Sequence, residues 1–373
     1  MRKPVILCVV GTRPEAIKMA PVVIGLRARD DLSALIVSTG QHRDLVAPQL
    51  AHFGLVPDID LGIAADGRTL AGQLGRLLEA LDTCLATALP DLVIGQGDTL
   101  SAFAAALSAF YRQIPFAHVE AGLRTDRLDS PFPEEMHRRA IALATRLHFA
   151  PTRSAANRLA TEGVPADRIL ITGNSVIDAL FHVTARQEPT RAARASFLFT
   201  LHRRESVDMA DDILAAVGRI ALERPDIDVV YPVHPNPAFH DRAHSQLGRI
   251  ANVRLTQPLD YPDLVAAMAA SLFVVTDSGG LQEEAPALGK PVLVLREVSE
   301  RMEAVESGAA LLIGTNGDRI VRETLRLIDC ADSRARMAIG GSPYGDGRAG
   351  TRIASACARY LGAARDIPID AFG

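Results

Sequence analysis

Short apolar runs alternate with longer amphipathic segments along the whole chain, and this alternation limits the possible folds more than any other feature. The run PVILCVV (residues 4–10) has no charged residue, which is typical of a strand buried on both faces of a sheet. The next segment, PEAIKMAPVVIGLRA (14–28), has helical periodicity and begins with a proline. Repeated units of this kind predict an α/β fold whose parallel sheets are covered by helices on both faces.

The strand–helix unit recurs in two stretches that are separated by a more polar connector. Strand candidates in the first stretch lie at 34–40, 91–98 and 114–122, and helix candidates lie at 70–89, 99–113 and 133–146. After ILITGNSVIDAL (169–180) and the connector, strand candidates resume at 195–202, 226–236, 252–259, 272–280, 291–297 and 309–315. We therefore expect two doubly wound parallel-sheet domains, residues 1–180 and 181–345, followed by a last helix within 346–373.

The composition argues against several classes of protein. The chain has 373 residues and a net charge of −4, whereas a general nucleic-acid binder usually carries a basic excess. Its four cysteines are scattered without a CxxC pair, which argues against a zinc knuckle or a disulfide framework. The first apolar run is too short to span a membrane. We expect a cytoplasmic protein that binds neither nucleic acid nor a membrane.

Two acidic residues stand where strands are predicted to end. Ligands of open parallel sheets bind beside the carboxyl ends of the strands, and Asp98 and Glu120 each follow a strand candidate. Two carboxyl groups in unlike environments can divide the roles of general acid and general base. Structural alternatives stay open, because Asp98 can cap the next helix and Glu120 can pair with Arg124.

The segment TDSGGLQEEA (276–285) has the residue types of a phosphate site. It joins an apolar strand to a helix, and free backbone N–H groups and the helix dipole at such a junction favour an anion. Glu283 or Glu284 can then accept hydrogen bonds from the hydroxyls of a ribose. The small residues that would let the backbone approach the phosphate are Ser278, Gly279 and Gly280. A helix start without a ligand explains the segment equally well.

Cations and acids also gather at the starts of two other predicted helices. In GTRPEAIK (11–18), Arg13 and Lys18 suit a phosphate, although a solvated basic end is the alternative. Glu134 and Arg138 lie four residues apart on one helix face, which an ordinary surface ion pair explains. Glu135 falls on another face, and we expect it to take no part in the site.

Two motifs resemble ligand sites but lack the residues that those sites need. HDRAH (240–244) has the histidine spacing of a zinc helix, but aspartate replaces the glutamate and no third ligand is evident. VVGTRPE (9–15) lacks the GxGxxG spacing of a dinucleotide site. We expect neither a metal nor a nicotinamide cofactor.

Taken together, the segments resemble the non-hydrolysing UDP-N-acetylglucosamine 2-epimerases. The matching pieces run in one order along nearly the whole chain and include GTRPEAIKMAPV (11–22), GDT (97–99), HVEAGLRT (118–125), SPFPEE (130–135), HRRES (202–206) and TDSGGLQEEAPALGKPVLVLRE (276–297). The resemblance implies a GT-B-like fold, with two Rossmann-like domains facing each other across a cleft and the terminal helix packed back on the first. It also implies a cytoplasmic homodimer in polysaccharide biosynthesis that binds a UDP-sugar and needs no cofactor.

The implied reaction inverts C2 of the sugar of UDP-N-acetylglucosamine, giving UDP-N-acetylmannosamine. The C2 proton is not acidic, and the family removes it by elimination: UDP leaves C1, a 2-acetamidoglucal forms, and UDP adds back. By motif position the catalytic group is Asp98, Glu120, Glu134 and His202. The diphosphate would contact Arg13, His202, Ser278, Gly279 and Gly280, the ribose would contact Glu284, and Lys18 and Arg138 would support the sugar site.

Some alternatives stay open within this resemblance. The motifs do not assign the acids to the two faces of C2. A hydrolysing epimerase, which releases free N-acetylmannosamine and UDP, shares the elimination step, and a 2-epimerase of a related nucleotide sugar is a further alternative. The family usually has asparagine before the arginine of PEExNR, whereas this chain has His137.

Overall fold

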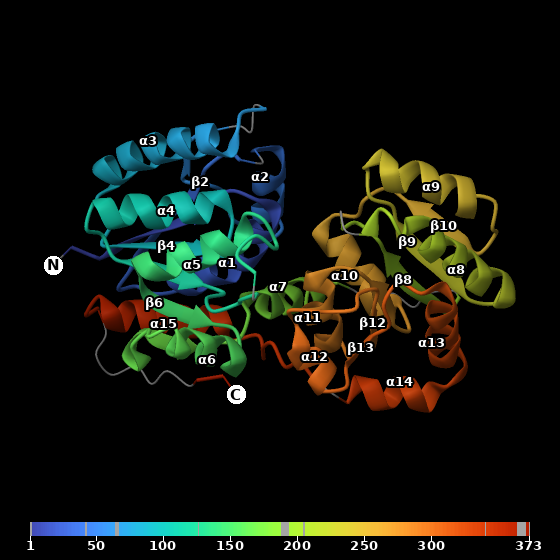
Figure 1. Cartoon of the computed structure of the whole chain (residues 1–373). Helices are drawn as coiled ribbons and strands as arrows, with labels where there is room; N and C mark the ends of the chain where they lie inside the picture. The colour runs from blue at the N-terminus through green and yellow to red at the C-terminus, as the bar shows by residue number, and fades with distance from the viewer. Residues whose placement is uncertain are drawn as a thin grey trace. The chain divides into compact units, whose positions relative to one another are not determined.

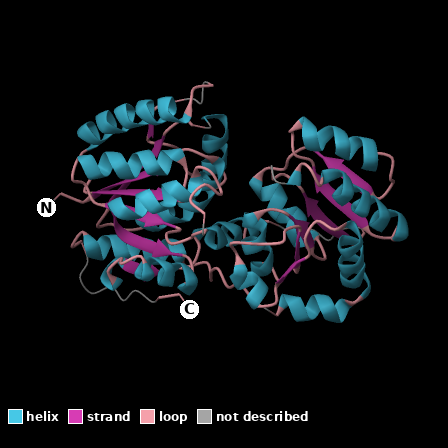
Figure 2. Ribbon diagram, in the orientation of Figure 1, coloured by secondary structure: helices cyan, strands magenta, loops and turns pink. Residues whose placement is uncertain are grey.

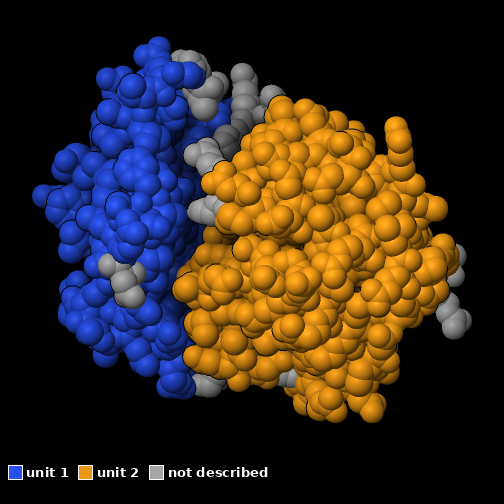
Figure 3. Space-filling view, turned by 45° about the vertical axis from the view of Figure 1, so that its right-hand side comes forward, with its two compact units in different colours: residues 1–182, 345–373 blue, residues 183–344 orange. Residues whose placement is uncertain are grey.

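The computed structural model describes residues 2–41, 43–63, 67–125, 127–187, 194–203, 206–339, 341–363 and 371–372. Arg204 and Glu205 of the HRRES segment lie outside the described residues. The chain divides into two compact units, which Figure 3 distinguishes by colour. Unit 1 comprises Met1–His182 with Gly345–Gly373, and unit 2 comprises Val183–Tyr344.

Unit 1 is built on a seven-stranded parallel sheet with the strand order β3-β2-β1-β4-β5-β6-β7. The chain order reverses between β1 and β4, which makes the carboxyl ends of these two strands the expected ligand position. The strands are β1 (Val5–Val10), β2 (Ser33–Ser38), β3 (Ile59–Asp60), β4 (Leu92–Gln96), β5 (Phe116–Val119), β6 (Thr145–Ala150) and β7 (Ile169–Ile171).

Helices cover both faces of this sheet (Figures 1 and 2). Helices α3, α4 and α5 lie side by side on one face, and α1 packs against α2 and α15 on the other. The helices are α1 (Arg13–Arg27), α2 (Arg43–Ala51), α3 (Leu70–Ala88), α4 (Leu100–Tyr111), α5 (Glu134–Ala144), α6 (Arg153–Thr161), α7 (Ser175–Thr184) and α15 (Ala349–Tyr360), with a short 3₁₀ helix η1 (Ala166–Arg168).

The terminal helix α15 packs very closely on α1. A Cβ atom added to Gly25 would lie 2.8 Å from the carbonyl oxygen of Gly350, and one added to Gly350 would lie 2.5 Å from that of Pro21. Both glycines are therefore needed for the two helix backbones to approach. Asp178 of α7 accepts hydrogen bonds from the first backbone N–H groups of α15, at Ala349 and Gly350, which caps the helix.

Unit 2 repeats the doubly wound plan with six parallel strands in the order β10-β9-β8-β11-β12-β13. Its reversal lies between β8 and β11. The strands are β8 (Ser196–Thr200), β9 (Asp228–Pro232), β10 (Val253–Thr256), β11 (Val274–Thr276), β12 (Val292–Val294) and β13 (Ala310–Leu312). The helices are α8 (Ala210–Glu223), α9 (Pro237–Leu247), α10 (Tyr261–Ala270), α11 (Gly279–Ala287), α12 (Met302–Glu306), α13 (Gly317–Asp329) and α14 (Ala331–Ala338).

The predicted pair of parallel α/β sheets is confirmed, with one local error. The helix predicted at 133–146 ends at Ala144, and residues 145–150 form β6. No loop separates the two elements, so the pattern gives no sign of the change. Within the described residues, no helix is long and apolar enough to cross a membrane.

Candidate functional site

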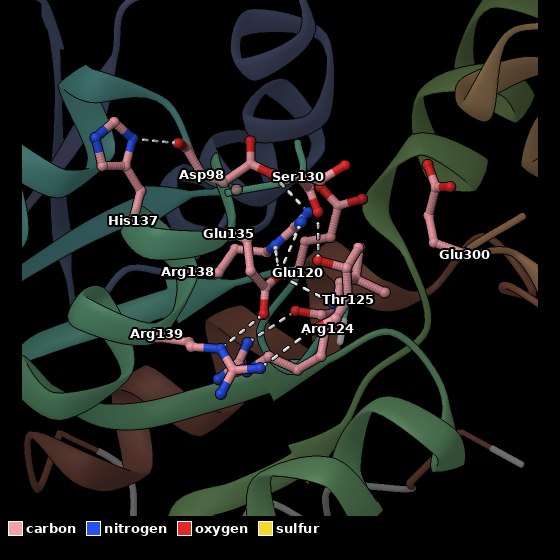
Figure 4. A network of polar contacts seen from close by, with 12 residues as sticks. Asp98, Glu120, Arg124, Thr125, Ser130, Glu135, His137, Arg138, Arg139 and Glu300 are labelled. Carbon is pink, nitrogen blue, oxygen red and sulfur yellow. Dashed lines mark hydrogen bonds and ion pairs between the residues drawn. The ribbon is translucent and has the colours of Figure 1, made fainter. Parts of the chain in front are cut away.

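The carboxyl ends of β1, β4 and β5 bring several of the predicted acids and cations of unit 1 to one edge of the sheet, and Figure 4 shows Asp98, Glu120 and Arg138 among them. The segment after β1 leads into α1 with Arg13 and Lys18, Asp98 follows β4, and Glu120 directly follows β5. Helix α5 adds Arg138, which reaches Asp98. Because these strands are neighbours in a parallel sheet, residues that are far apart in the sequence share one edge.

An unusual backbone conformation and several donor side chains hold Glu120 in place. Its backbone φ is 64°, a left-handed value that is rare for a residue with a side chain. Lys18 Nζ donates to both carboxylate oxygens, at 2.6 and 2.7 Å. Asn174 donates to Oε1 at 3.2 Å, and Gln96 donates to Oε2. A carboxylate has about four lone-pair sites, so these contacts fill them and stabilise the ionised form.

Asp98 lies in a different environment from Glu120. One of its oxygens accepts a hydrogen bond from Arg138 Nη1 at 2.9 Å. Burial raises the pKa of Asp98 above its ordinary value; Arg138 opposes this rise, whereas the negative charges of Glu120 and Glu134 add to it. The carboxyl group of Glu120 is thus stabilised as an anion, whereas that of Asp98 holds its proton more tightly than usual.

Both structural alternatives for these acids are wrong. Thr99, not Asp98, caps α4, because the Thr99 hydroxyl accepts a hydrogen bond from the backbone N–H of Ala102 at 3.0 Å. Arg124 pairs with Glu162 through two contacts of 2.8 Å and not with Glu120.

Glu135 is part of the network, and the prediction that it takes no part is wrong. Its fully buried carboxylate binds Arg138 Nε at 2.9 Å, Arg139 Nε at 2.8 Å and the backbone N–H of Thr125 at 3.0 Å. Glu135 faces the loop after β5, where a buried anion needs these donors. Arg138 therefore bridges Glu135 and Asp98.

The structural alternative for Glu134 and Arg138, an ordinary surface ion pair, does not form among the described residues. Arg138 is already occupied by Asp98 and Glu135. Within the described part of the chain, the half-exposed side chain of Glu134 forms no hydrogen bond or ion pair, but its charge acts on Asp98. Glu134 is the acid of this group that stays open to a ligand.

Glu15 is a site residue that sequence reasoning missed. It is buried, and it accepts hydrogen bonds from the backbone N–H groups of Gly11 and Thr12 at 3.0 and 2.7 Å and from the Thr99 hydroxyl at 2.6 Å. It thereby ties the segment after β1 to the segment that carries Asp98. The spacing T-x-x-E at the start of α1 is a capping-box pattern and was the available signal.

In unit 2, His202 is oriented by an aspartate at the end of the neighbouring strand. His202 Nδ1 lies 3.0 Å from a carboxylate oxygen of the fully buried Asp277. Asp277 also accepts hydrogen bonds from the backbone N–H groups of His202 and Arg203 and from the Ser206 hydroxyl. Burial raises the pKa of Asp277, but these donors outweigh burial and hold it below its ordinary value. An anionic Asp277 fixes Nδ1 of His202 as the donor and leaves Nε2 for a ligand.

The predicted phosphate segment forms the start of α11, with Ser278 at the N-cap. A Cβ atom on Gly279 would lie 3.2 Å from the guanidinium carbon of Arg301 and 3.3 Å from Arg203 Nη2. Two cations thus flank this helix start, and both bind Glu300, at 3.2 Å for Arg203 and 2.6 Å for Arg301. Burial alone raises the pKa of Glu300, but its arginine neighbours hold it well below its ordinary value.

The two glutamates of α11 have separate partners. Glu283 binds Arg301 Nε at 2.9 Å, and Glu284 accepts a hydrogen bond from the Tyr261 hydroxyl at 2.8 Å. Burial raises the pKa of that hydroxyl, and the charge of Glu284 raises it further. Tyr261 therefore stays a donor and fixes the direction of Glu284. Glu283 is thus paired with a cation, whereas Glu284, the predicted ribose ligand, is bound by a neutral hydroxyl.

The family model for UDP-N-acetylglucosamine 2-epimerase matches residues 25–358 of the chain. The UDP-N-acetylglucosamine 2-epimerase of Salmonella typhimurium is 43% identical over 370 residues, which cover 95% of this chain and 98% of that protein. The chain belongs to the UDP-N-acetylglucosamine 2-epimerase family. A relative of the same name from Bacillus subtilis is 41% identical over 375 residues and covers 99% of this chain and 98% of its own length.

Solved structures of the family share the fold of this chain. The UDP-GlcNAc 2-epimerase of Neisseria meningitidis, whose structure contains bound UDP-GlcNAc, superposes with a TM-score of 0.90 at 37% identity, covering 95% of this chain and all of that one. The S. aureus MnaA–UDP structure gives a TM-score of 0.92 at 38% identity over 99% of this chain and 100% of that one. The family and the GT-B-like fold class predicted from the sequence are thus confirmed, whereas the roles of the individual residues stay predictions.

Proposed function

We propose that the protein catalyses the reversible inversion of C2 in UDP-N-acetylglucosamine, which gives UDP-N-acetylmannosamine. The observation that carries the proposal is the pairing of two unlike carboxyl groups. Glu120 is surrounded by donors, with Lys18 bound to both of its oxygens, and Asp98, whose pKa is raised, follows the neighbouring strand. Inversion by elimination and re-addition needs such groups of unlike proton affinity. The UDP-GlcNAc bound to the N. meningitidis relative supports the substrate.

In the proposed reaction the C1–oxygen bond to UDP breaks and the C2 proton is removed, so that a 2-acetamidoglucal and UDP form. UDP then adds back to C1, and a proton is delivered to the opposite face of C2. Unit 1 supplies Asp98, Glu120 and Glu134 for proton transfer. All lone-pair sites of Glu120 are occupied, so it must release a donor before it can accept a proton. Lys18 and Arg138 support the sugar site by holding Glu120 and Asp98.

Unit 2 is proposed to hold the departing UDP. The backbone N–H groups of Ser278, Gly279 and Gly280 and the guanidinium of Arg13 are proposed as donors for the diphosphate. Because Nδ1–H of His202 already donates to Asp277, His202 donates to the diphosphate from Nε2 when its ring carries a hydrogen on both nitrogens. Glu284 binds the ribose hydroxyls with its direction fixed by Tyr261. His202 belongs to the catalytic group as well, because charge on the leaving diphosphate develops as the C1–oxygen bond breaks.

The product identifies the reaction. Incubation with UDP-N-acetylglucosamine, followed by NMR, is expected to give an equilibrium with UDP-N-acetylmannosamine. Free N-acetylmannosamine and UDP would instead identify the hydrolysing alternative, and turnover of only a different nucleotide sugar would reassign the substrate. Asp98→Asn and Glu120→Gln are each expected to lower turnover at least about 100-fold. Near-normal turnover in both variants would remove these acids from the mechanism.

We further propose that the protein works as a cytoplasmic homodimer on a precursor of polysaccharide synthesis. All four cysteines are free thiols, as expected in a reducing compartment. Phe110 and Tyr111 at the end of α4 and Leu143 near the end of α5 are exposed to 59%, 70% and 89%. Helices α4 and α5 are neighbours, and exposed apolar side chains on adjacent helices are typical of an interaction surface. Sedimentation equilibrium is expected to give twice the chain mass; the mass of a single chain would contradict the dimer.

A further inference from the structure

Two histidines from different elements bind consecutive backbone carbonyls at the turn that carries Asp98. His118 Nε2, on β5, lies 2.7 Å from the carbonyl oxygen of Gly97. His137 Nδ1, on α5, lies 2.9 Å from the carbonyl oxygen of Asp98 itself, as Figure 4 shows. A carbonyl oxygen only accepts hydrogen bonds, so each of these ring nitrogens carries a hydrogen and donates it.

The chemical form of His118 agrees with this assignment. Its other ring nitrogen, Nδ1, is buried and has no hydrogen-bond partner among the described residues. Burial lowers the pKa of His118 to about 4, although the bond to Gly97 opposes the shift. His118 is therefore a neutral imidazole at physiological pH with its hydrogen on Nε2.

The carbonyl groups of Gly97 and Asp98 accept hydrogen bonds from these two histidines because the backbone N–H groups of α4 do not bind them. Gly97 has a φ of 74° and donates its backbone N–H to Val119 at 3.0 Å. The first backbone bond of α4 runs from Phe103 N to the carbonyl of Thr99, one residue after Asp98. The carbonyl of Asp98 thus lies outside the helix ladder and is bound by His137.

His137 is itself rigidly placed. It is buried, and its ring stacks on that of Phe103, with centroids 5.0 Å apart and the planes 16° from parallel. The next residue, Arg138, binds the carboxylate of Asp98. Two successive residues of α5 therefore hold the same aspartate, one by its backbone and one by its side chain.

We propose that His137 is a positioning residue that directs the carboxylate of Asp98 through the hydrogen bond to its carbonyl. The inference rests on the proposed function, in which Asp98 takes part in proton transfer. What the site requires at position 137 is an N–H donor at the δ position, and asparagine carries an amide nitrogen at that same position. Histidine and asparagine are then two residues that can meet this requirement.

The test compares two substitutions of His137. His137→Asn keeps a donor and is expected to keep most of the wild-type kcat. His137→Leu keeps a buried side chain that packs on Phe103 but removes the donor, and its kcat is expected to fall by about 10- to 100-fold, the usual effect of a misplaced catalytic group. The Kd for UDP, measured by calorimetry, is expected to be unchanged in both variants, because neither substitution changes a proposed donor to the diphosphate. Melting temperatures test whether both variants fold.

The outcomes separate the two proposals. A wild-type protein without epimerase activity overturns the proposed function and this inference with it. An active wild type with equal kcat values for His137→Asn and His137→Leu overturns only the positioning role. If His137→Leu does not fold, His137→Ala replaces it in the comparison, and an asparagine variant no faster than the alanine variant overturns the inference.

Discussion

Replacing Lys18 with methionine removes the ammonium group that binds both oxygens of Glu120. The side chains of this pair are only 13% and 5% exposed, so solvent screens their interaction weakly. At the 2.6 Å separation of the closer contact, two unit charges attract by about 6 kcal/mol at an effective dielectric constant of roughly 20. Breaking a buried pair on one side typically destabilises a protein by about 3–5 kcal/mol.

Gln96 and Asn174 still donate to Glu120 in Lys18→Met, and the carboxylate can also take up a proton. We therefore expect a loss of about 3 kcal/mol, at the lower end of that range. For a unit of this size each kcal/mol shifts the melting temperature by roughly 2–4 °C, so Lys18→Met should melt about 6–12 °C below the wild type. Scanning calorimetry measures the shift. Arg127→Met, which removes the exposed partner of Asp129, is the control and should not change the melting temperature measurably.

The double variant Lys18→Met with Glu120→Gln isolates the interaction between the two side chains. A neutral amide in place of the carboxylate no longer needs the cation, so the double variant should be more stable than the sum of the single losses predicts, by about 2 kcal/mol. Strictly additive losses would show that the two groups do not stabilise each other, and the reasoning about the buried pair would be wrong.

Two further predictions concern Glu15 and Asp277, to which the sequence motifs assigned no individual role. Burial raises the pKa of Glu15 to about 7 from an ordinary 4.5. The folded protein therefore binds this proton more tightly than the unfolded chain does. As the pH rises from 4.5 to 7, the free energy of unfolding should fall by about 3 kcal/mol. Denaturant unfolding of Glu15→Gln should lack this loss, and identical pH slopes in the two proteins would contradict it. Asp277→Asn removes the anionic acceptor of His202 Nδ1 and should lower kcat by about 10- to 100-fold; an unchanged kcat in a folded variant would exclude Asp277 from orienting the imidazole.

Much of the fold was predictable from the pattern of apolar runs, because strands buried on both faces of a parallel sheet leave continuous apolar segments. Strand β6 was not, since its sequence TRLHFA contains polar residues and follows α5 without a turn. Asp98 and Glu120 were identified by the rule that ligands bind at strand ends. The rule could be applied because the apolar runs show where the strands end.

The partners of these acids depend on tertiary packing, which the sequence pattern does not contain. Lys18 is 102 residues from Glu120 along the chain, and no local spacing relates them. Helical periodicity placed Glu134 and Arg138 on one face but did not reveal that the loop after β5 covers Glu135. Glu15 was accessible to sequence reasoning, because a capping box marks it.

Exchange of the C2 hydrogen of the sugar with solvent distinguishes proton transfer from every mechanism that leaves the C2–hydrogen bond intact. The protein is incubated with UDP-N-acetylglucosamine in heavy water, and the C2 proton is followed by NMR, with Asp98→Asn as the control. We predict that deuterium enters C2 of both UDP-N-acetylglucosamine and UDP-N-acetylmannosamine, at a rate at least about 100-fold lower in the control. Epimer formation with the original proton retained at C2, or UDP binding without any exchange, would contradict it.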